Sequence, residues 1–255
     1  MAEEMNIGQL DENLILKILS LVPIKSVVST SVLSKEWQSR WKSVPKLKFN
    51  SEDYQSEHQT FSETVYKSLL SYEPEVLDSF HLSFGSDKAD AVDVVHWIKT
   101  AFALHLRTLV LEFLIYPYEV DEFIFTSSLC TCDTLETLKL GSLILLTIYF
   151  IGKYRIKPDY HVLGWEWNKP KSVPKCLLSH LETFVWRRYD WKGEKEEEVA
   201  TYLLKNARGL KNATFSTGPI EPGQLDKLKQ RRRTRKKLDG VLKASNTCHL
   251  VFKFE

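Results

Sequence analysis

A short apolar pattern, Leu-x-x-Leu-x-Leu, recurs at a fixed distance along the chain and limits the folds open to it. It begins at residues 77, 106 and 135, with Phe80 in place of the second Leu in the first copy, and the two steps between its copies are equal. A similar pattern begins at residue 181 and returns at residue 210, which is a step of the same length. Alternating apolar positions are typical of β-strands, and a fixed period of this length indicates structural units that stack side by side.

The segment between the first two copies predicts a helix. Residues 90–103 place four apolar side chains on one helical face: Val94, Val95, Ile98 and Phe102. A strand and a helix in every ~20–29 residues is the plan of a leucine-rich repeat, whose units bury their apolar faces only against one another. An ordinary α/β domain with coincidental spacing is the alternative.

In such a solenoid, the strand residues between the apolar positions lie on the concave surface, where a partner binds. The candidate target-binding residues at these positions are Thr108, Val110, Thr137 and Lys139. An earlier helix is predicted by a buried stripe of Phe61, Val65, Leu69 and Tyr72. The rhythm breaks between residues 141 and 168, which predicts a shortened repeat region.

Composition excludes several classes of protein. The chain has 255 residues, of which 43% are hydrophobic, so disorder throughout is excluded. Its 35 Lys and Arg against 33 Asp and Glu leave a formal net charge of +2, which argues against a protein that coats nucleic acid with its whole surface.

The most apolar stretch, residues 143–151, is shorter than the roughly 20 residues of a membrane-spanning helix. Four Cys without a secretory signal predict an intracellular location, in the nucleus or cytoplasm or both.

The first fifty residues predict three short helices. Asp11 is expected to cap the first, which Pro23 ends and whose single apolar face combines Leu14, Ile15, Ile18, Leu19 and Val22. The second is expected over residues 25–33, with Val27, Val28 and Val32 directed inward. The third follows a capping Ser34 and carries Trp37 and Trp41 one turn apart. So small a unit cannot hide this much apolar surface alone, so it is either a cap on a larger domain or a docking module.

Residues 7–49 resemble a plant-type F-box. The matching residues are Leu10, Leu14, Ile15, Ile18, Leu19, Ser20, Leu21, Pro23, Lys25, Val28, Thr30, Ser31, Leu33, Ser34, Lys35, Trp37 and Trp41. The resemblance implies docking on the Skp-type adaptor of an SCF ubiquitin ligase and, through it, on cullin and RING subunits. The adaptor-binding residues that it implies are Leu10, Leu14, Ile15, Ile18, Leu19, Pro23, Val28, Leu33, Trp37 and Trp41.

The chain departs from the F-box pattern at the start of the first helix. The family usually has Leu-Pro there, where this chain has Leu10-Asp11. An Asp cap should preserve the helix, but loss of the Pro ring could weaken adaptor binding. Glu36, where the family prefers Arg, is a milder departure.

The C-terminal ninety residues resemble the FBD domain of many plant F-box proteins. The matching residues are Trp167, Val173, Pro174, Cys176, Leu177, Leu181, Phe184, Trp186, Tyr189, Lys205, Asn206, Ala207, Leu210, Cys248 and Leu250. Within this region, the acidic run 194–198 predicts a helix start, followed by an apolar stripe of Val199, Tyr202, Leu203 and Leu204. Residues 247–254 predict a final edge strand. The FBD resemblance implies no catalytic residue.

A basic run interrupts this region. Eight of the eleven residues 227–237 are Lys or Arg. The candidates for a nuclear-import signal or a phosphate-binding patch are Lys229, Arg231, Arg232, Arg233, Arg235, Lys236 and Lys237. A solvated helix end with internal charge pairs is the alternative.

No catalytic constellation is found: phosphate-binding loops, nucleophile elbows and metal-ligand spacings are absent from the sequence, so no catalytic residue, metal or cofactor is expected. The sequence predicts an α plus α/β chain with a three-helix F-box (1–50), truncated irregular leucine-rich repeats (51–165) and an FBD-type cap (166–255). The predicted function is a non-catalytic substrate receptor that recruits an unknown target protein. The alternatives are a nuclear nucleic-acid-associated protein that uses the basic run and a decayed family member without a target.

Overall fold

The structure is a computed structural model of the chain. It describes residues 10–54, 60–73, 76–85, 91–115, 132–141, 169–187, 189, 194–218, 225–241 and 243–254. Over these residues, N-terminal helices are followed by helices that alternate with the strands of a parallel sheet. The predicted organisation, a helical N-terminal part joined to an α/β part, is therefore confirmed.

The strands of the described sheet follow one another in space in the order of the sequence. They are β1 (Lys46–Asn50), β2 (Ser79–Gly85), β3 (Thr108–Ile115), β4 (Thr137–Gly141), β5 (Thr183–Arg187), β6 (Asn212–Thr217) and β7 (His249–Phe254). Every neighbouring pair is parallel, so each connection must return to the starting end of the sheet. The predicted final strand is confirmed as β7, at the edge of the sheet.

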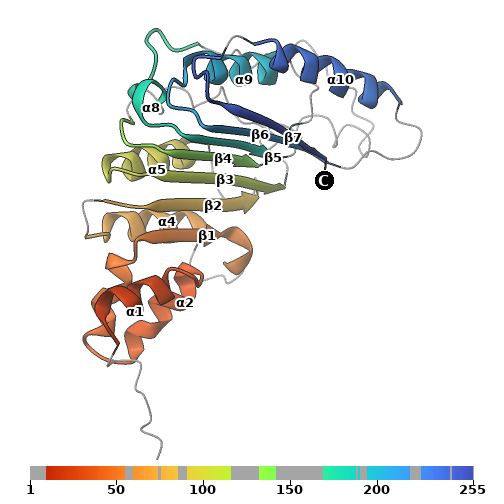
Figure 1. Cartoon of the computed structure of the whole chain (residues 1–255). Coiled ribbons are helices and arrows are strands. Elements are labelled where there is room, and N and C mark those ends of the chain that lie inside the picture. The colour runs from red at the N-terminus through yellow and green to blue at the C-terminus, as the bar shows by residue number, and fades with distance from the viewer. Residues whose placement is uncertain are drawn as a thin grey trace, which may run out of the picture.

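Helices lie in the connections between these strands. They are α4 (Phe61–Leu70), α5 (Ala91–Ala103), α8 (Lys175–Ser179), α9 (Glu194–Asn206) and α10 (Leu225–Asp239). The N-terminal part contains α1 (Glu12–Leu19), α2 (Ile24–Ser29) and α3 (Trp37–Arg40), with 3-10 turns η2 (Thr30–Val32) and η3 (Trp41–Ser43); a further turn, η4 (Ser51–Asp53), follows β1. Figure 1 shows α1 and α2 beside β1 at one end of the sheet, with α9 and α10 at the opposite end.

The register of the sheet reproduces the spacing of the sequence pattern. Ser79 pairs with Thr108, and Thr108 with Thr137, so the two steps along the chain are equal. Thr183 and Asn212 are paired at the same spacing, whereas Thr137 of β4 pairs with Thr183 of β5 after a longer step. The longer step contains residues 142–168, where the pattern breaks and which lie outside the described residues.

The apolar positions of the pattern face the core. Phe80, Leu109, Leu138, Phe184 and Ala213 occupy equivalent positions on consecutive strands and are fully buried. They belong to one continuous core that also includes the predicted stripes of α4 and α9. On α5, Ile98 and Phe102 are buried as predicted, while Val94 and Val95 are partly buried and Trp97, which the pattern did not single out, is buried.

The N-terminal helices differ from the prediction in length and orientation. Helix α1 ends at Leu19, before Pro23 is reached, and α2 ends at Ser29, where the 3-10 turn η2 begins. Val28 and Val32 were expected to point inward; this is wrong, since both are exposed. The shortened α2 turns Val32 to solvent, because a 3-10 turn has a different period from an α-helix.

Candidate functional site

The N-terminal helices divide their apolar residues between two surfaces. Five are packed into the core with at most 7% of their surface exposed: Ile15, Leu19, Ile24, Val27 and Trp37. Seven others are exposed and form what we call the docking face: Leu14, Ile18, Leu21, Val22, Val28, Val32 and Leu33. Leu21 and Val32 are 80% and 87% exposed, so no described part of the chain covers this face. Scattered apolar residues are normal on a protein surface, but seven within one short segment indicate an interaction site.

Local hydrogen bonds fix the start of α1 and so the placement of the docking face. Asp11 caps the helix, because its Oδ1 accepts hydrogen bonds from the backbone N–H of Asn13 (2.9 Å) and Leu14 (3.3 Å). The predicted role of Asp11 as a substitute start signal is confirmed. Leu14 and Ile18 are four residues apart and share one side of α1, whereas Ile15 and Leu19 share the side that packs inward.

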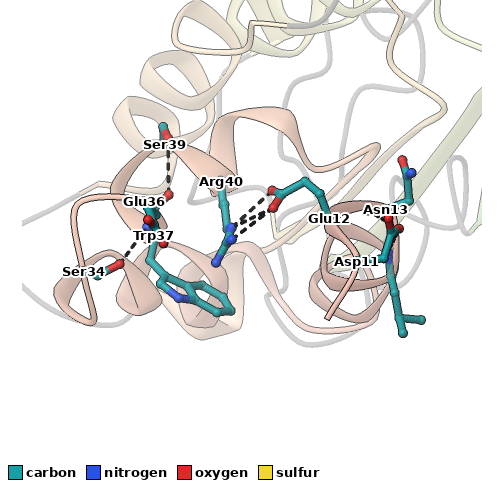
Figure 2. Close-up of polar contacts among 9 residues, drawn as sticks. Asp11, Glu12, Asn13, Ser34, Glu36, Trp37, Ser39 and Arg40 are labelled. Carbon is teal, nitrogen blue, oxygen red and sulfur yellow. Dashed lines mark hydrogen bonds and ion pairs between the residues drawn. The ribbon is translucent and has the colours of Figure 1, made fainter. Parts of the chain in front are cut away.

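An ion pair ties α1 to α3 beneath this surface. Arg40 Nη2 lies 3.0 Å from Glu12 Oε2, and Arg40 Nε donates to both Glu12 oxygens at 3.2 Å. The same guanidinium carbon lies 4.5 Å from the centre of the Trp37 ring. Figure 2 shows the Arg40 side chain extending to Glu12. The backbone N–H of Trp37 donates to Ser34 Oγ at 3.4 Å, but the N-cap residue of α3 is Glu36, so the predicted cap at Ser34 is wrong.

The predicted adaptor-binding residues fall on both surfaces. Leu14, Ile18, Val28 and Leu33 lie on the docking face, and Pro23 is exposed beside it. Ile15, Leu19 and Trp37 lie in the core, and Leu10 and Trp41 are partly buried against it. The predicted set does not include Leu21, Val22 or Val32, which are also exposed, and Val32 was expected to point inward.

The predicted target-binding residues come together on the open face of the sheet, the side opposite the apolar positions. Thr108 and Val110 on β3 pair directly with Thr137 and Lys139 on β4, and all four are partly buried. The same rows continue onto β5 through Thr183 and Val185. Hydroxyl, aliphatic and cationic side chains thus lie side by side over adjacent strands.

Near the ends of the strands, the open face carries a charged network that the sequence did not predict. His81 Nε2 on β2 lies within hydrogen-bond distance of Glu112 Oε2 on β3, at 3.2 Å. Arg187 Nη1 on β5 donates a hydrogen bond to Glu112 Oε1 at 2.9 Å. Arg187 reaches it across Gly141 of β4, where a Cβ would lie 3.1 Å from Glu112 Cγ. The hydrogen bond with His81, assisted by the charges of His81, Arg187 and Lys48, lowers the pKa of the Glu112 carboxyl below its ordinary value although burial opposes it.

Comparisons with known proteins identify the two ends of the chain. Residues 7–49 match the family described as F-box domain, and residues 169–215 match the family described as FBD. The Arabidopsis thaliana F-box/FBD/LRR-repeat protein At3g52680 is 34% identical to this chain over an alignment that covers 98% of the chain and 93% of that protein. The chain belongs to the F-box/FBD/LRR-repeat family. The FBD-associated F-box protein At3g52670 of the same plant is likewise 34% identical, with 99% and 98% covered.

The family matches can be placed on the fold. The F-box match ends at Phe49, inside β1, so the F-box segment contributes the first strand of the sheet. The FBD match runs from before α8 into β6 and stops short of the basic helix α10. The alignments with these F-box/FBD/LRR relatives extend over 429 and 414 positions, more than the 255 residues of this chain, so they contain long gaps here.

Among the described residues, no group of three or more His, Cys, Asp or Glu side chains is arranged to hold a metal ion. None of the helices within the described ranges is long and apolar enough to cross a membrane. Cys132 and Cys176 are buried there as neighbouring thiols, and the hydrogen bond with the Cys132 thiol together with burial raises the pKa of Cys176.

Proposed function

We propose that this protein is the substrate-receptor subunit of an SCF-type ubiquitin ligase. The docking face supports the proposal, because seven exposed aliphatic side chains favour burial against a partner. F-box family membership supplies the partner, a Skp-type adaptor through which cullin and RING subunits are reached. The chain contributes proximity between the target and the ubiquitin-carrying enzyme rather than chemistry of its own.

The two surfaces of the F-box take different roles in this proposal. The docking face contacts the adaptor, led by Leu21, Val32 and Leu33, which are the most exposed. The buried residues Ile15 and Leu19 hold the helices in place instead of touching the partner. Arg40 fixes α1 against α3 from beneath.

We infer that the sheet is a short, irregular leucine-rich-repeat solenoid that ends in an FBD-type cap, and that its open face recruits the target. The register supports this, since three of its steps along the chain have the same length. The adjacency of Thr108, Val110, Thr137 and Lys139 supports a target site there. A location in the nucleus or cytoplasm accompanies this role and can be tested by imaging a fluorescent fusion.

Capture of a purified Skp-type adaptor tests the proposed docking. The variant Leu21→Asp/Val32→Asp/Leu33→Asp places three carboxylates on the docking face and should reduce capture at least about tenfold, because a buried unpaired charge is costly. The matched control is Leu70→Asp/Val92→Asp/Leu225→Asp. Its three positions are 62%, 76% and 65% exposed and lie outside the docking face, so capture should be unchanged.

The outcomes separate the alternatives. Failure of the intact chain to capture the adaptor would contradict the proposal outright. Equal losses in the two triple variants would show that added charge, and not the docking face, controls capture. Circular dichroism of both variants establishes that they remain folded, as expected for substitutions at solvent-exposed positions.

A further inference from the structure

The basic run that the sequence singled out lies within helix α10, and seven of its eight charges fall into two groups. Three of them hold the helix to the rest of the protein. Arg231, which is buried, donates to the carbonyl oxygen of Gly218; Arg235 lies over the Phe252 ring at 5.2 Å; and Lys237 pairs with Glu197 of α9 at 2.9 Å. These residues have structural partners, so they are not free to bind a ligand.

Four further charges, all of them exposed, form what we call the outer stripe: Lys229, Arg232, Arg233 and Lys236. Their spacing of three, four and seven residues places them on one side of the helix. The inward residues Arg231, Thr234 and Leu238 are buried on the opposite side, so the outer stripe points to solvent. In Figure 1, α10 lies at the end of the molecule farthest from α1 and α2.

The outer stripe is poorly neutralised. Lys229 approaches Asp226 at 3.8 Å, but both side chains are largely solvated. Arg232, Arg233 and Lys236 form no ion pair within the part of the chain that the structure describes. Four like charges at spacings of three and four residues repel one another along a helix. A ligand with a regular array of negative charges removes that repulsion.

We propose that the outer stripe binds the phosphate backbone of duplex DNA without reading its sequence. The outer stripe itself contains only cations, and the exposed large apolar side chains described on α10 are Leu225 and Leu228, whereas protein–protein interfaces bury an apolar and aromatic centre with few charges. Helix α10 has no aromatic residue on which an unpaired base could stack, which disfavours single-stranded RNA. The stripe extends about 10 Å along the helix, so it can reach several phosphates of a duplex.

The net charge of +2 does not oppose this site, because an average over the whole chain says nothing of the charge on one helix face. The site lies at the other end of the molecule from the docking face. Binding of DNA is therefore independent of adaptor binding and goes beyond the proposed ligase role.

Fluorescence anisotropy with a labelled duplex of about 20 base pairs tests the proposal on the full chain. The affinity should fall with salt at a logarithmic slope of about −3 to −4, as expected for four phosphate contacts. The variant Lys229→Gln/Arg232→Gln/Arg233→Gln/Lys236→Gln should bind about tenfold or more weakly at low salt and lose most of that slope. Its capture of the adaptor should be unchanged.

A charge-matched control removes four other exposed lysines: Lys46→Gln/Lys99→Gln/Lys171→Gln/Lys175→Gln. It should keep the affinity of the wild type within about threefold.

Equal weakening in both variants would assign binding to net charge and overturn the proposal, as would wild-type affinity in the outer-stripe variant. Tighter binding of single-stranded RNA or of poly-glutamate than of the duplex would overturn the choice of ligand. An unchanged melting temperature in the outer-stripe variant shows that any loss of binding is not unfolding.

Discussion

Glu112 is the centre of a charged network on the open face of the sheet. Its carboxylate joins His81 on one side and Arg187 on the other, so one side chain links β2, β3 and β5. Gly141 lies between them and leaves the space that Arg187 crosses. Since 28% of the Glu112 side chain is exposed, the network is partly shielded from water and strengthens the sheet more than a fully solvated pair would.

This network predicts a pH dependence of stability. The pKa of Glu112 is lowered from 4.5 in the folded protein. The carboxylate therefore stabilises the fold at a pH above its pKa in the unfolded chain, and this stabilisation is lost as the pH falls through its lower pKa in the folded protein. Glu112→Gln should therefore lower the free energy of unfolding by about 1 kcal/mol at neutral pH. The difference from the wild type should shrink toward zero near pH 3, as measured by urea unfolding.

Glu136→Gln serves as the control for that experiment. Its carboxylate lies 3.9 Å from Arg107 and is 52% exposed, so its removal should change stability little at any pH. If Glu112→Gln and Glu136→Gln change the free energy of unfolding equally between pH 3 and pH 7, the Glu112 network does not contribute more to stability than an exposed ion pair. Gly141→Ala should mimic part of the Glu112 effect, because its Cβ would press on Glu112 Cγ.

At the scale of single residues, the sequence predicts the contacts between residues that are close neighbours in the chain. The cap at Asp11 acts over two and three residues, and its chemistry is visible in the sequence. The pairs of Glu12 with Arg40 and of Glu112 with Arg187 join residues 28 and 75 positions apart. Only the fold brings such residues together, so no local pattern could have indicated them.

At the scale of elements, the packing of α1 against α3 depends on the Glu12–Arg40 pair. The Arg40 side chain is 12% exposed and that of Glu12 is 54% exposed, so loss of the carboxylate leaves a mostly buried guanidinium without its partner. A double-mutant cycle with Glu12→Gln and Arg40→Gln should give a coupling energy of about 1 kcal/mol. Adaptor capture should weaken in each single variant, because α1 carries Leu14 and Ile18 of the docking face.

The cycle distinguishes pairing from other effects of these residues. Glu12 also lies in the first turn of α1, where a negative charge favours the helix, and Arg40 contacts Trp37. Both contributions cancel in the coupling energy, whereas a direct interaction does not. Additive losses in the double variant would therefore show that the two side chains act separately.

The elements themselves were predictable where an apolar period repeats. The strands beginning near residues 79, 108 and 137 follow a pattern that the sequence shows without any structure. Strand β1 carries a similar apolar pattern, Val44-x-x-Leu47-x-Phe49, with all three residues buried, inside the segment that matches the F-box domain. The ends of α1 and α2 were misjudged because their last turns change to shorter-period turns.

At the scale of the whole molecule, the F-box and the sheet share one core. The backbone N–H of Asp78, which precedes β2, donates to the Pro45 carbonyl at 3.0 Å, and the N–H of Glu73 donates to the Lys42 carbonyl at 3.3 Å. Lys25 of α2 reaches the carbonyl of Asp53 at 2.7 Å. These bonds fix the docking face relative to β1 and β2, so an adaptor and a target bound to this chain would have a set geometry.

The order of the described strands, in which each one pairs only with its neighbours in the sequence, predicts that a destabilising substitution acts mainly near its own position. In stacked repeats each unit contacts its neighbours, so stability passes from one unit to the next instead of being shared by all. Phe49→Ala removes a buried ring packed against Phe80, and Phe215→Ala removes one packed against Phe184 at the other end of the sheet. Each should cost about 3–5 kcal/mol locally.

The two variants should therefore differ in adaptor capture. Phe49→Ala should lower the melting temperature and weaken capture on warming, because β1 belongs to both the F-box and the sheet. Phe215→Ala should produce an earlier unfolding transition of the C-terminal strands while capture persists through it. Parallel thermal melts and capture assays measure both effects. If Phe215→Ala abolished capture at the same temperature as Phe49→Ala, the chain would unfold as a single block and nearest-neighbour stacking would not describe it.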